Sequence, residues 1–166
     1  MNRFYYVSNE EWYKANEKAI KDNTVKLLGC DYEGISLPKR ATKGSAGYDF
    51  CSPYNFIVKP GETVKFPSMV KCMMNEGTVL MIFPRSSLGF KYKFTLDNLV
   101  GIIDKDFFGN IDNEGHIQFK FTNNGDKDLE IKIGDRIAQG IFVKYEITED
   151  DYVEEERKGG IGSTNK

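Results

Sequence analysis

The chain has 166 residues, a formal net charge of −2 at pH 7 and 29% charged residues. This length suits one ordinary domain that needs no disulfide or metal to fold, and the lack of a basic excess argues against binding to polymeric nucleic acid. The three cysteines are widely spaced and there is a single histidine, which predicts a cytoplasmic protein without disulfides or zinc. The sequence has no apolar run of membrane-spanning length, and we expect no export signal and no membrane contact.

The first 24 residues are expected to form a helical extension. Ser8 to Glu11 has the pattern of a capping box, in which the Ser8 hydroxyl covers a free amide and Glu11 reaches back. Apolar residues from Trp12 to Ile20 then recur at near-helical spacing, which predicts one short helix. The aromatic run Phe4 to Tyr6 before it is interpreted as a packing patch.

From Thr24 onward the chain consists of short β-rich runs separated by Gly, Pro, Asn and Asp. These runs are Val25 to Leu28, Tyr48 to Cys51, Phe56 to Val58, Thr63 to Phe66, Thr78 to Phe83, Phe94 to Leu96, Val100 to Ile103, His116 to Phe121, Leu129 to Ile133 and Ile137 to Val143. So many short strands predict an all-β sandwich or barrel over residues 25–147.

The run Val100 to Ile103 leads directly into Asp104, and Phe107 and Gly109 then suit a tight reversal. Such a hairpin holds a carboxylate rigidly beside backbone amides and an aromatic face, which a pocket for a small ligand needs. An ordinary surface turn with an Asp in it is the alternative interpretation.

Three other stretches combine a backbone-permissive residue with a carboxylate or an anion-binding group: Ala46 to Asp49, Phe83 to Gly89 and Gly134 to Gln139. Arginine and paired hydroxyls can hold phosphate oxygens. Each stretch alone also fits a strand-end Asp, a capped turn or a surface ion pair.

Residues 148–166 differ from the rest, because an acidic run is followed by the Gly-rich end Arg157 to Lys166. One interpretation is a frayed terminus without enough apolar surface to become ordered. The other is a phosphate lid, in which glycine amides, the hydroxyls of Ser163 and Thr164 and the Arg157 guanidinium converge on an anion.

Five stretches, in order, resemble the five motifs of the trimeric deoxyuridine triphosphatases, over roughly residues 25 to 164. They are Ala46 to Asp49, Pro84 to Leu88, Gly101 to Gly109, Gly134 to Gln139 and Gly159 to Thr164. The resemblance implies a jelly-roll-like β-barrel with a flexible Gly-rich tail, assembled as a homotrimer. It also implies that the protein splits dUTP into dUMP and diphosphate with Mg²⁺, which keeps uracil out of DNA and supplies dUMP for dTMP synthesis.

The resemblance also implies a role for each matching residue. Asp104 would orient the attacking water, and Asp49 would contact Mg²⁺ through water. Contacts with the phosphates would come from Arg85, Ser86, Ser87, Arg136 and Gln139. Uracil would be contacted by Asn98 and by the backbone of Gly101, Ile102 and Ile103, and the sugar by Phe107. The lid over the nucleotide would consist of Arg157, Gly160, Ile161, Gly162 and Ser163. Hairpin, phosphate motifs and tail would come from three different subunits.

Several positions depart from the usual family pattern. Phe107 stands where the family usually has Tyr, and Ile161 replaces an aromatic that in many members stacks over uracil. The spacing of Arg157 from the glycine pair is also unusual, which leaves open whether it reaches the γ-phosphate. Asn110 to His116 resembles an insertion of some bacterial and phage members, which favours such an origin.

Two alternative functions remain open at this stage. The related dCTP deaminases share the fold and use a glutamate after the third motif as proton carrier, near the place of Glu114. However, Phe90 stands where those enzymes have arginine. The other alternative is a protein of this fold that binds a regulatory partner.

Overall fold

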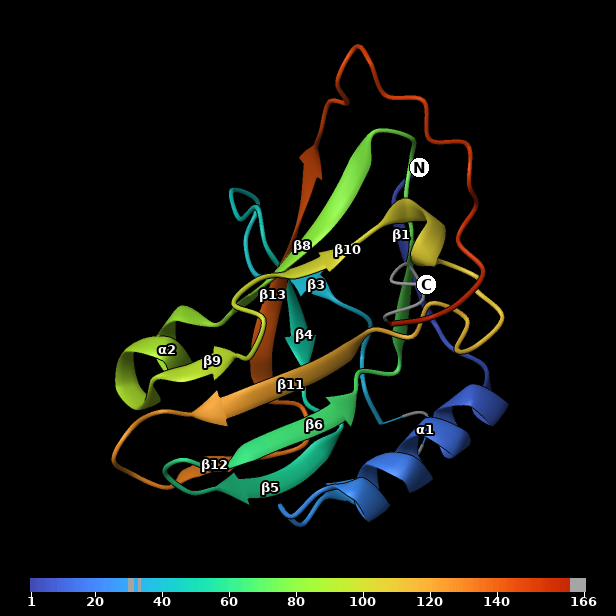
Figure 1. The fold of residues 1–166 in the computed structure, drawn as a ribbon. Helices are drawn as coiled ribbons and strands as arrows, with labels where there is room; N and C mark the ends of the chain where they lie inside the picture. Colours follow the sequence, from blue (N-terminus) through green and yellow to red (C-terminus); the bar gives the residue numbers. More distant parts are fainter. Residues whose placement is uncertain (30–31, 33, 162–166) are drawn as a thin grey trace.

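The computed structural model describes residues 1–29, 32 and 34–161 (Figure 1). The strands are β1 (Arg3–Tyr6), β2 (Leu28–Gly29), β3 (Lys39–Arg40), β4 (Tyr48–Cys51), β5 (Tyr54–Val58), β6 (Thr63–Pro67), β7 (Val70–Met73), β8 (Thr78–Pro84), β9 (Phe94–Leu96), β10 (Gly101–Ile103), β11 (Gln118–Asn123), β12 (Leu129–Ile131) and β13 (Arg136–Lys144). The helices are α1 (Asn9–Asp22), α2 (Ser86–Tyr92) and the 3-10 helix η1 (Lys105–Phe107).

All of the strand pairs are antiparallel. The largest sheet has the order β10-β8-β13-β4-β3, and smaller sheets have the orders β6-β11-β9, β12-β5-β2 and β1-β7. This arrangement confirms the predicted all-β, jelly-roll-like fold. The described strands form these four separate sheets rather than one closed barrel.

Most predicted strands are present with shifted ends, but four elements were missed. Only Leu28 of the run Val25 to Leu28 is in a strand, and β1, β3, β7 and α2 were not predicted. The helix α2 contains Gly89 and no buried residue, so it has no helical pattern of apolar residues. Strand β1 is held by pairing with β7, about 70 residues away, which no local pattern reveals.

The core is built on aromatic side chains that connect α1 to the sheets. The rings of Trp12, Tyr54, Phe66, Phe119 and Phe50 follow one another with centroid distances between 5.6 and 5.9 Å. All five side chains are essentially inaccessible to water. Burial of one such side chain stabilises the fold by about 2–3 kcal/mol, so this row fixes the helix and sheets relative to one another.

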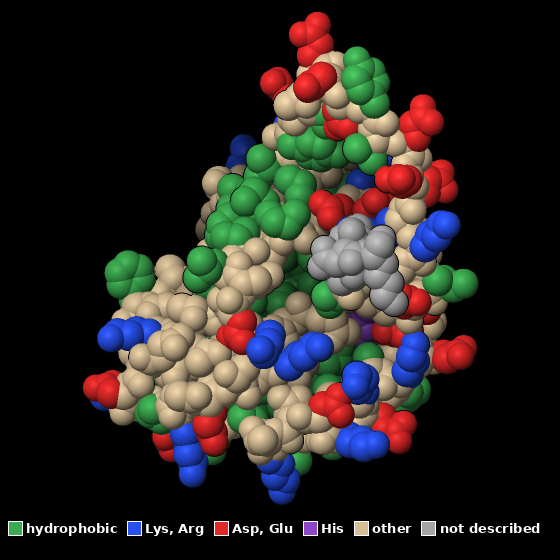
Figure 2. Space-filling model, in the orientation of Figure 1, with side chains coloured by type: hydrophobic (Ala, Val, Ile, Leu, Met, Phe, Trp, Pro, Cys, Tyr) green, Lys and Arg blue, Asp and Glu red, His purple; other side chains and the backbone are tan. Residues whose placement is uncertain are grey.

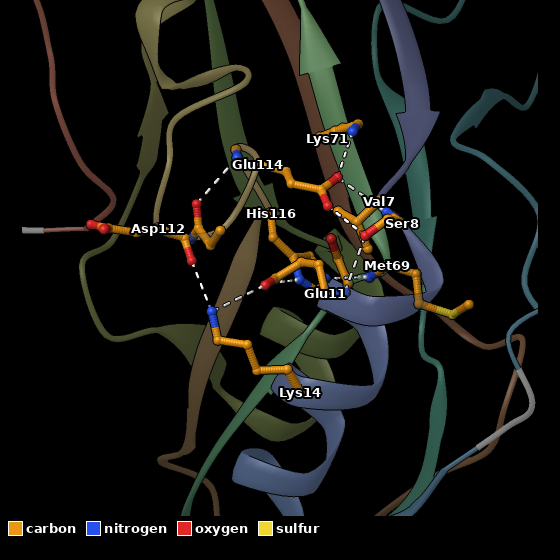
Figure 3. A network of polar contacts seen from close by, with 12 residues as sticks. Val7, Ser8, Glu11, Lys14, Met69, Lys71, Asp112, Glu114 and His116 are labelled. Carbon is orange, nitrogen blue, oxygen red and sulfur yellow. Dashed lines mark hydrogen bonds and ion pairs between the residues drawn. The ribbon is translucent and has the colours of Figure 1, made fainter.

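The N-terminus of α1 confirms half of the predicted capping box. The Ser8 Oγ accepts a hydrogen bond from the Glu11 amide at 3.1 Å, as expected. Glu11 does not reach back, because the Ser8 amide instead donates to Glu114 Oε2 at 3.1 Å (Figure 3). A residue of the predicted insertion therefore completes the cap of a helix that lies 106 positions earlier in the chain.

The Glu11 carboxylate is instead buried against His116. The backbone amide of Met69 donates to His116 Nε2 at 3.0 Å, so the proton of the ring lies on Nδ1. His116 Nδ1 then donates to Glu11 Oε1 at 3.0 Å. This chain of hydrogen bonds satisfies two fully or nearly buried polar side chains and ties α1 to the loop before β11.

Neither described α-helix is long and apolar enough to cross a bilayer. Cys51 and Cys72 are free thiols, and burial raises the pKa of Cys72 to about 12. Cys72 is therefore protonated and unreactive at neutral pH.

The contacts of Glu114 predict a specific acid dependence of stability. Burial raises the pKa of this carboxyl, but hydrogen bonds from Lys71 and Ser8 outweigh it and lower the pKa to about 2, from an ordinary value of 4.5. Because the folded pKa lies below the unfolded one, the stabilisation is complete above pH 4.5 and is lost as the pH falls toward 2. Glu114→Gln should destabilise the protein by about 1 kcal/mol at pH 7.

Urea unfolding followed by the fluorescence of Trp12 measures this difference. The gap between wild type and Glu114→Gln should narrow from pH 7 to pH 3, and Glu130→Gln, at an exposed position, should follow wild type throughout. An equal gap at both pH values would contradict the assigned ion pair.

Candidate active site

A pocket of about 230 Å³ lies between β10, η1 and the start of β11. It is lined by Ile82, Leu96, Asn98, Gly101, Ile102, Ile103, Asp104, Phe107, Ile117, Gln118, Phe119, Arg157 and Ile161. The face in Figure 2 is hollowed at this place, and hydrophobic side chains line the hollow. The predicted hairpin residues and two tail residues thus meet in one pocket with a mostly apolar wall and a few polar groups, as small-molecule sites require.

A tight turn brings Asn98 to the pocket. The Leu99 amide donates to the Leu96 carbonyl at 2.9 Å, and Leu99 has a φ of 61°. Gly101 then passes close to β8, since a Cβ at this position would lie 3.2 Å from the Cβ of Ile82. A larger residue at 101 would push β10 away from β8 and open the pocket wall.

Asp104 directly follows β10 and precedes η1, whose last residue Phe107 is only 5% exposed. The expected β-hairpin is wrong here, because β10 pairs with β8 and not with the next strand along the chain. The reversal after Asp104 is a 3-10 turn, closed by a hydrogen bond from the Phe107 amide to the Asp104 carbonyl. The carboxylate of Asp104 therefore stands at the pocket rim with about half of its side-chain surface exposed.

The C-terminal tail lies across this rim. Arg157 Nη2 donates to Asp104 Oδ2 at 2.9 Å, Arg157 Nε donates to Asp106 Oδ1 at 3.0 Å, and the guanidinium lies 5.5 Å from the centre of the Phe107 ring. Gly160 nearby is buried. The frayed-terminus interpretation is thus wrong for residues 157–161, and the predicted lid residues Gly162 and Ser163 lie outside the described residues.

Sequence reasoning missed Asp106 as part of the site. Its carboxylate and that of Asp104 both form an ion pair with the Arg157 guanidinium. These two ion pairs form because the tail lies against the turn after Asp104. The Asp104-Lys105-Asp106 spacing was the available signal, since two carboxylates two positions apart flank one turn.

The second group of predicted residues surrounds Asp49. This carboxylate is 8% exposed and pairs with Arg85 through Oδ1 and with Arg136 through Oδ2, the latter at 3.2 Å. Gln139 lies close to Gly47, where a Cβ would come within 2.7 Å of the Gln139 Oε1. A side chain at position 47 would therefore displace the end of the Gln139 side chain.

Next to this cluster is an open groove. It is lined by Phe83, Pro84, Arg85, Ser86, Gly89, Phe90, Gln139 and Ile141. Ser86 is exposed in the first turn of α2, whereas Ser87 lies beside it without lining the groove. The groove thus has the Arg85 guanidinium and the Ser86 hydroxyl in its lining, and Arg136 lies near it because it shares the Asp49 carboxylate with Arg85. Such groups are suited to binding a phosphate chain.

The groove and the pocket lie far apart within one chain. Ile103 of β10 is paired with Leu80 of β8, which sets Asp104 beside position 79, whereas Arg85 follows the other end of β8. Positions 79 and 85 are roughly 20 Å apart at about 3.3 Å per residue. The two sites share no lining residue, and α2 and η1 lie on opposite sides of β8 in Figure 1.

Within the described part of the chain, no group of three His, Cys, Asp or Glu side chains could hold a metal ion. Asp49 is a buried carboxylate with both oxygens on arginines, and Asp104 and Asp106 share Arg157. This donor set does not form a cage for a divalent cation. It fits an ion such as Mg²⁺ that keeps its waters and is held mainly by a ligand's phosphates.

Glu114, the residue that a dCTP deaminase would need, points away from the pocket. Its carboxylate accepts hydrogen bonds from Ser8 and from Lys71, the latter at 2.6 Å (Figure 3). It does not line the pocket that contains Asp104, so it has a structural role. Phe90, the other position that bears on deamination, is 91% exposed.

Comparison with known proteins agrees with these motifs. A model of the family described as dUTPase matches residues 33–165. The deoxyuridine 5'-triphosphate nucleotidohydrolase of Lactococcus lactis subsp. lactis is 41% identical over 133 residues, which cover 79% of this chain and 89% of that protein.

Solved structures support the same assignment. The dUTPase from Streptococcus mutans has a TM-score of 0.64 and 36% identity, and the match covers 75% of this chain and 98% of that one. A mutant dUTPase from phage phi11 of S. aureus, which coordinates a structural Mg(II) ion, shares the fold with a TM-score of 0.61 and 23% identity over 80% of this chain and 98% of that one.

The matches extend over most of this chain and nearly the whole length of the relatives. The resemblance seen in the five sequence motifs is thereby confirmed, and deamination is not favoured. The chain belongs to the dUTPase family.

Proposed function

We propose that the protein hydrolyses dUTP to dUMP and diphosphate, with Asp104 as the catalytic base. The observation that carries this proposal is the position of Asp104 at the rim of a pocket lined by Asn98 and Phe107, in a chain of the dUTPase family. The products follow from attack of water on the α-phosphorus: the bond from the water oxygen to phosphorus forms, the bond to the bridging oxygen breaks, and Asp104 takes the proton of the water.

Most of the remaining rate enhancement would come from positioning and charge neutralisation, because every phosphate oxygen carries charge in the transition state. Arg85 and Arg136 are already aimed at a carboxylate, so they present guanidinium groups that a phosphate can share. Arg157 can exchange Asp104 for a phosphate in the same way. This exchange frees the Asp104 carboxylate to accept a proton.

Base selection would rest on the backbone of Gly101 to Ile103 and on the Asn98 amide. Uracil and cytosine differ in one donor and one acceptor, so the wrong base leaves buried polar atoms unpaired. Phe107, almost fully buried, supports the sugar as a flat wall that leaves no room for a 2′-hydroxyl. Its missing hydroxyl, compared with the usual Tyr, does not change this wall.

We propose that Asp49, through a water molecule, would hold a Mg²⁺ ion that is bound mainly by the phosphates of the nucleotide. When bound, the ion neutralises charge on the phosphate oxygens and fixes their geometry. The ion pairs with Arg85 and Arg136 hold the Asp49 carboxylate in place for such a water contact. The Mg(II) ion of the phage phi11 relative is a precedent for the ion in this fold.

We also propose that the active protein is a homotrimer with sites shared between subunits. A phosphate within reach of a water on Asp104 is too far from Arg85 of the same chain, which follows the end of β8 roughly 20 Å away. Arg136, at the start of β13, shares Asp49 with Arg85 and lies at the same end. A neighbouring subunit would supply these arginines. The tail contact seen here, Arg157 on Asp104, joins residues of one chain, so the expected third contributor is not needed for that contact.

Asp104→Asn should leave the fold and nucleotide binding intact but slow turnover by at least about a hundredfold, because the amide keeps the shape and cannot accept the proton. Diphosphate release from dUTP measures turnover, and calorimetry with a non-hydrolysable dUTP analogue measures binding. Asp128→Asn, in an exposed turn, is the matched control. Unchanged turnover in the Asp104 variant would refute its role as base.

Shared sites can be tested by mixing two inactive variants, Asp104→Asn and Arg136→Ala. If the base and the phosphate-binding arginine of one site come from different subunits, random mixing of the two chains gives about a quarter of sites with both residues intact. Refolding the two variants together should therefore restore about a quarter of wild-type activity. If both residues act within one chain, the mixture stays at the average of its parents.

A further inference from the structure

The predicted insertion, residues 110–116, is in contact with three separate parts of the molecule: α1, the turn after Asp104 and the C-terminal tail. It lies between the active-site pocket and a larger groove of about 460 Å³ beside α1. Asp112 and Asn113 line the groove, and Ile161 lines both cavities. Neither the reaction nor the five motifs assign this loop a role.

The loop has a fixed shape. The buried Asn110 side chain donates to the Phe107 carbonyl at 2.7 Å, and its Oδ1 accepts from the amides of Asp112 and Asn113 at 3.1 and 3.2 Å. Gly115 has a φ of 85°, and a Cβ there would lie 2.6 Å from the Phe107 carbonyl oxygen. The position of the loop is thus tied to Phe107, the wall of the pocket.

From this loop, Asp112 holds the tail. The Gly160 amide donates to Asp112 Oδ2 at 2.8 Å, and Gly160 packs against Asn113. This contact is made by the backbone of the tail, three positions after Arg157. The Gly160 carbonyl also accepts from Arg157 Nη1 at 3.4 Å, whereas the contact with Asp112 does not depend on the Arg157 side chain.

The other side of the loop rests on α1. Lys14 donates to the Asp112 backbone carbonyl at 3.0 Å, as Figure 3 shows. The Glu114–Ser8 and His116–Glu11 contacts fix the following residues of the loop to the first turn of the helix. The helix, the loop and the tail thus form a continuous series of polar contacts that ends at the catalytic pocket.

We propose that Asp112 is a positioning residue for the dUTPase reaction: it holds the tail over the pocket before nucleotide binds, and α1 is its support. This inference rests on the proposed function. A tail that is already docked does not have to be ordered when dUTP binds, so the apparent affinity for the nucleotide is higher. The role of Asp112 is in binding, because its carboxylate contacts tail backbone and not the reacting atoms.

The experiment compares Asp112→Ala, Asp112→Asn and the control Asp126→Ala in an exposed turn, by two measurements. The first is the rate at which trypsin cleaves after Arg157 and Lys158 in the absence of nucleotide. The cleavage products are identified by mass, and the rate is divided by the rate of cleavage after Lys43 in the same digest. Cleavage reports the fraction of molecules with the tail undocked. The second is KM and kcat for dUTP.

Asp112→Ala should be cleaved at least about threefold faster in the tail, and its KM should rise about fivefold with kcat within about twofold of wild type. Asp112→Asn should restore both values, because its amide oxygen still accepts from Gly160. Unchanged cleavage in Asp112→Ala, or a kcat loss without a change in KM, would overturn the proposal.

Gly160→Pro removes the donor of the same hydrogen bond and leaves the loop intact, so it tests the contact even if Asp112→Ala fails to fold. It should raise tail cleavage as much as Asp112→Ala does, and the double variant should be no faster than either single one. Additive effects would show that the two residues act independently and would refute the contact. If wild type does not hydrolyse dUTP, the proposed function fails, while the cleavage rates still decide whether Asp112 holds the tail.

Discussion

Neutralisation of carboxylates by arginine is the interaction on which the site depends. Asp49 is held between Arg85 and Arg136, and Asp104 shares Arg157 with Asp106. A carboxylate removed from water is costly unless it is paired, so these guanidinium groups are fixed in place by the fold itself. Guanidinium groups of this kind also attract phosphate oxygens. If the proposed function holds, the ligand exchanges one anionic partner of these arginines for another.

The sequence allowed the prediction of those features that short stretches encode. Alternating apolar residues between Gly and Pro turns predicted most strands, and the five motifs predicted which side chains surround the pocket and the groove. The missed features depend on residues that are far apart in the chain. Strand β1 exists because β7 pairs with it, and the partner of the Ser8 amide is Glu114 and not Glu11. The pairing of Arg157 with Asp106 requires the tail to return across the whole domain, which no periodicity encodes.

Strand β8 determines how far apart the groove and the pocket lie within one chain. One end of this strand leads to the groove lined by Arg85, while β10, paired beside its other part, is followed by Asp104, the proposed base. A rigid central strand keeps these two functions at a fixed separation, and the exposed acidic segment 145–156, visible at the top of Figure 2, joins β13 to the returning tail. This separation is the reason for the proposal that sites are shared between subunits.

The cap of α1 by Glu114 also joins a segment that is synthesised earlier to one that is synthesised much later. The helix leaves the ribosome early, but its first turn lacks one hydrogen-bond acceptor until residue 114 has been made and folded beside it. Isolated helices of 14 residues are marginal in water, so α1 cannot be stable alone. Chain growth places the helix first, whereas the long-range contacts fix it late. The residues of α1 are therefore synthesised about 100 positions before the glutamate that completes their cap.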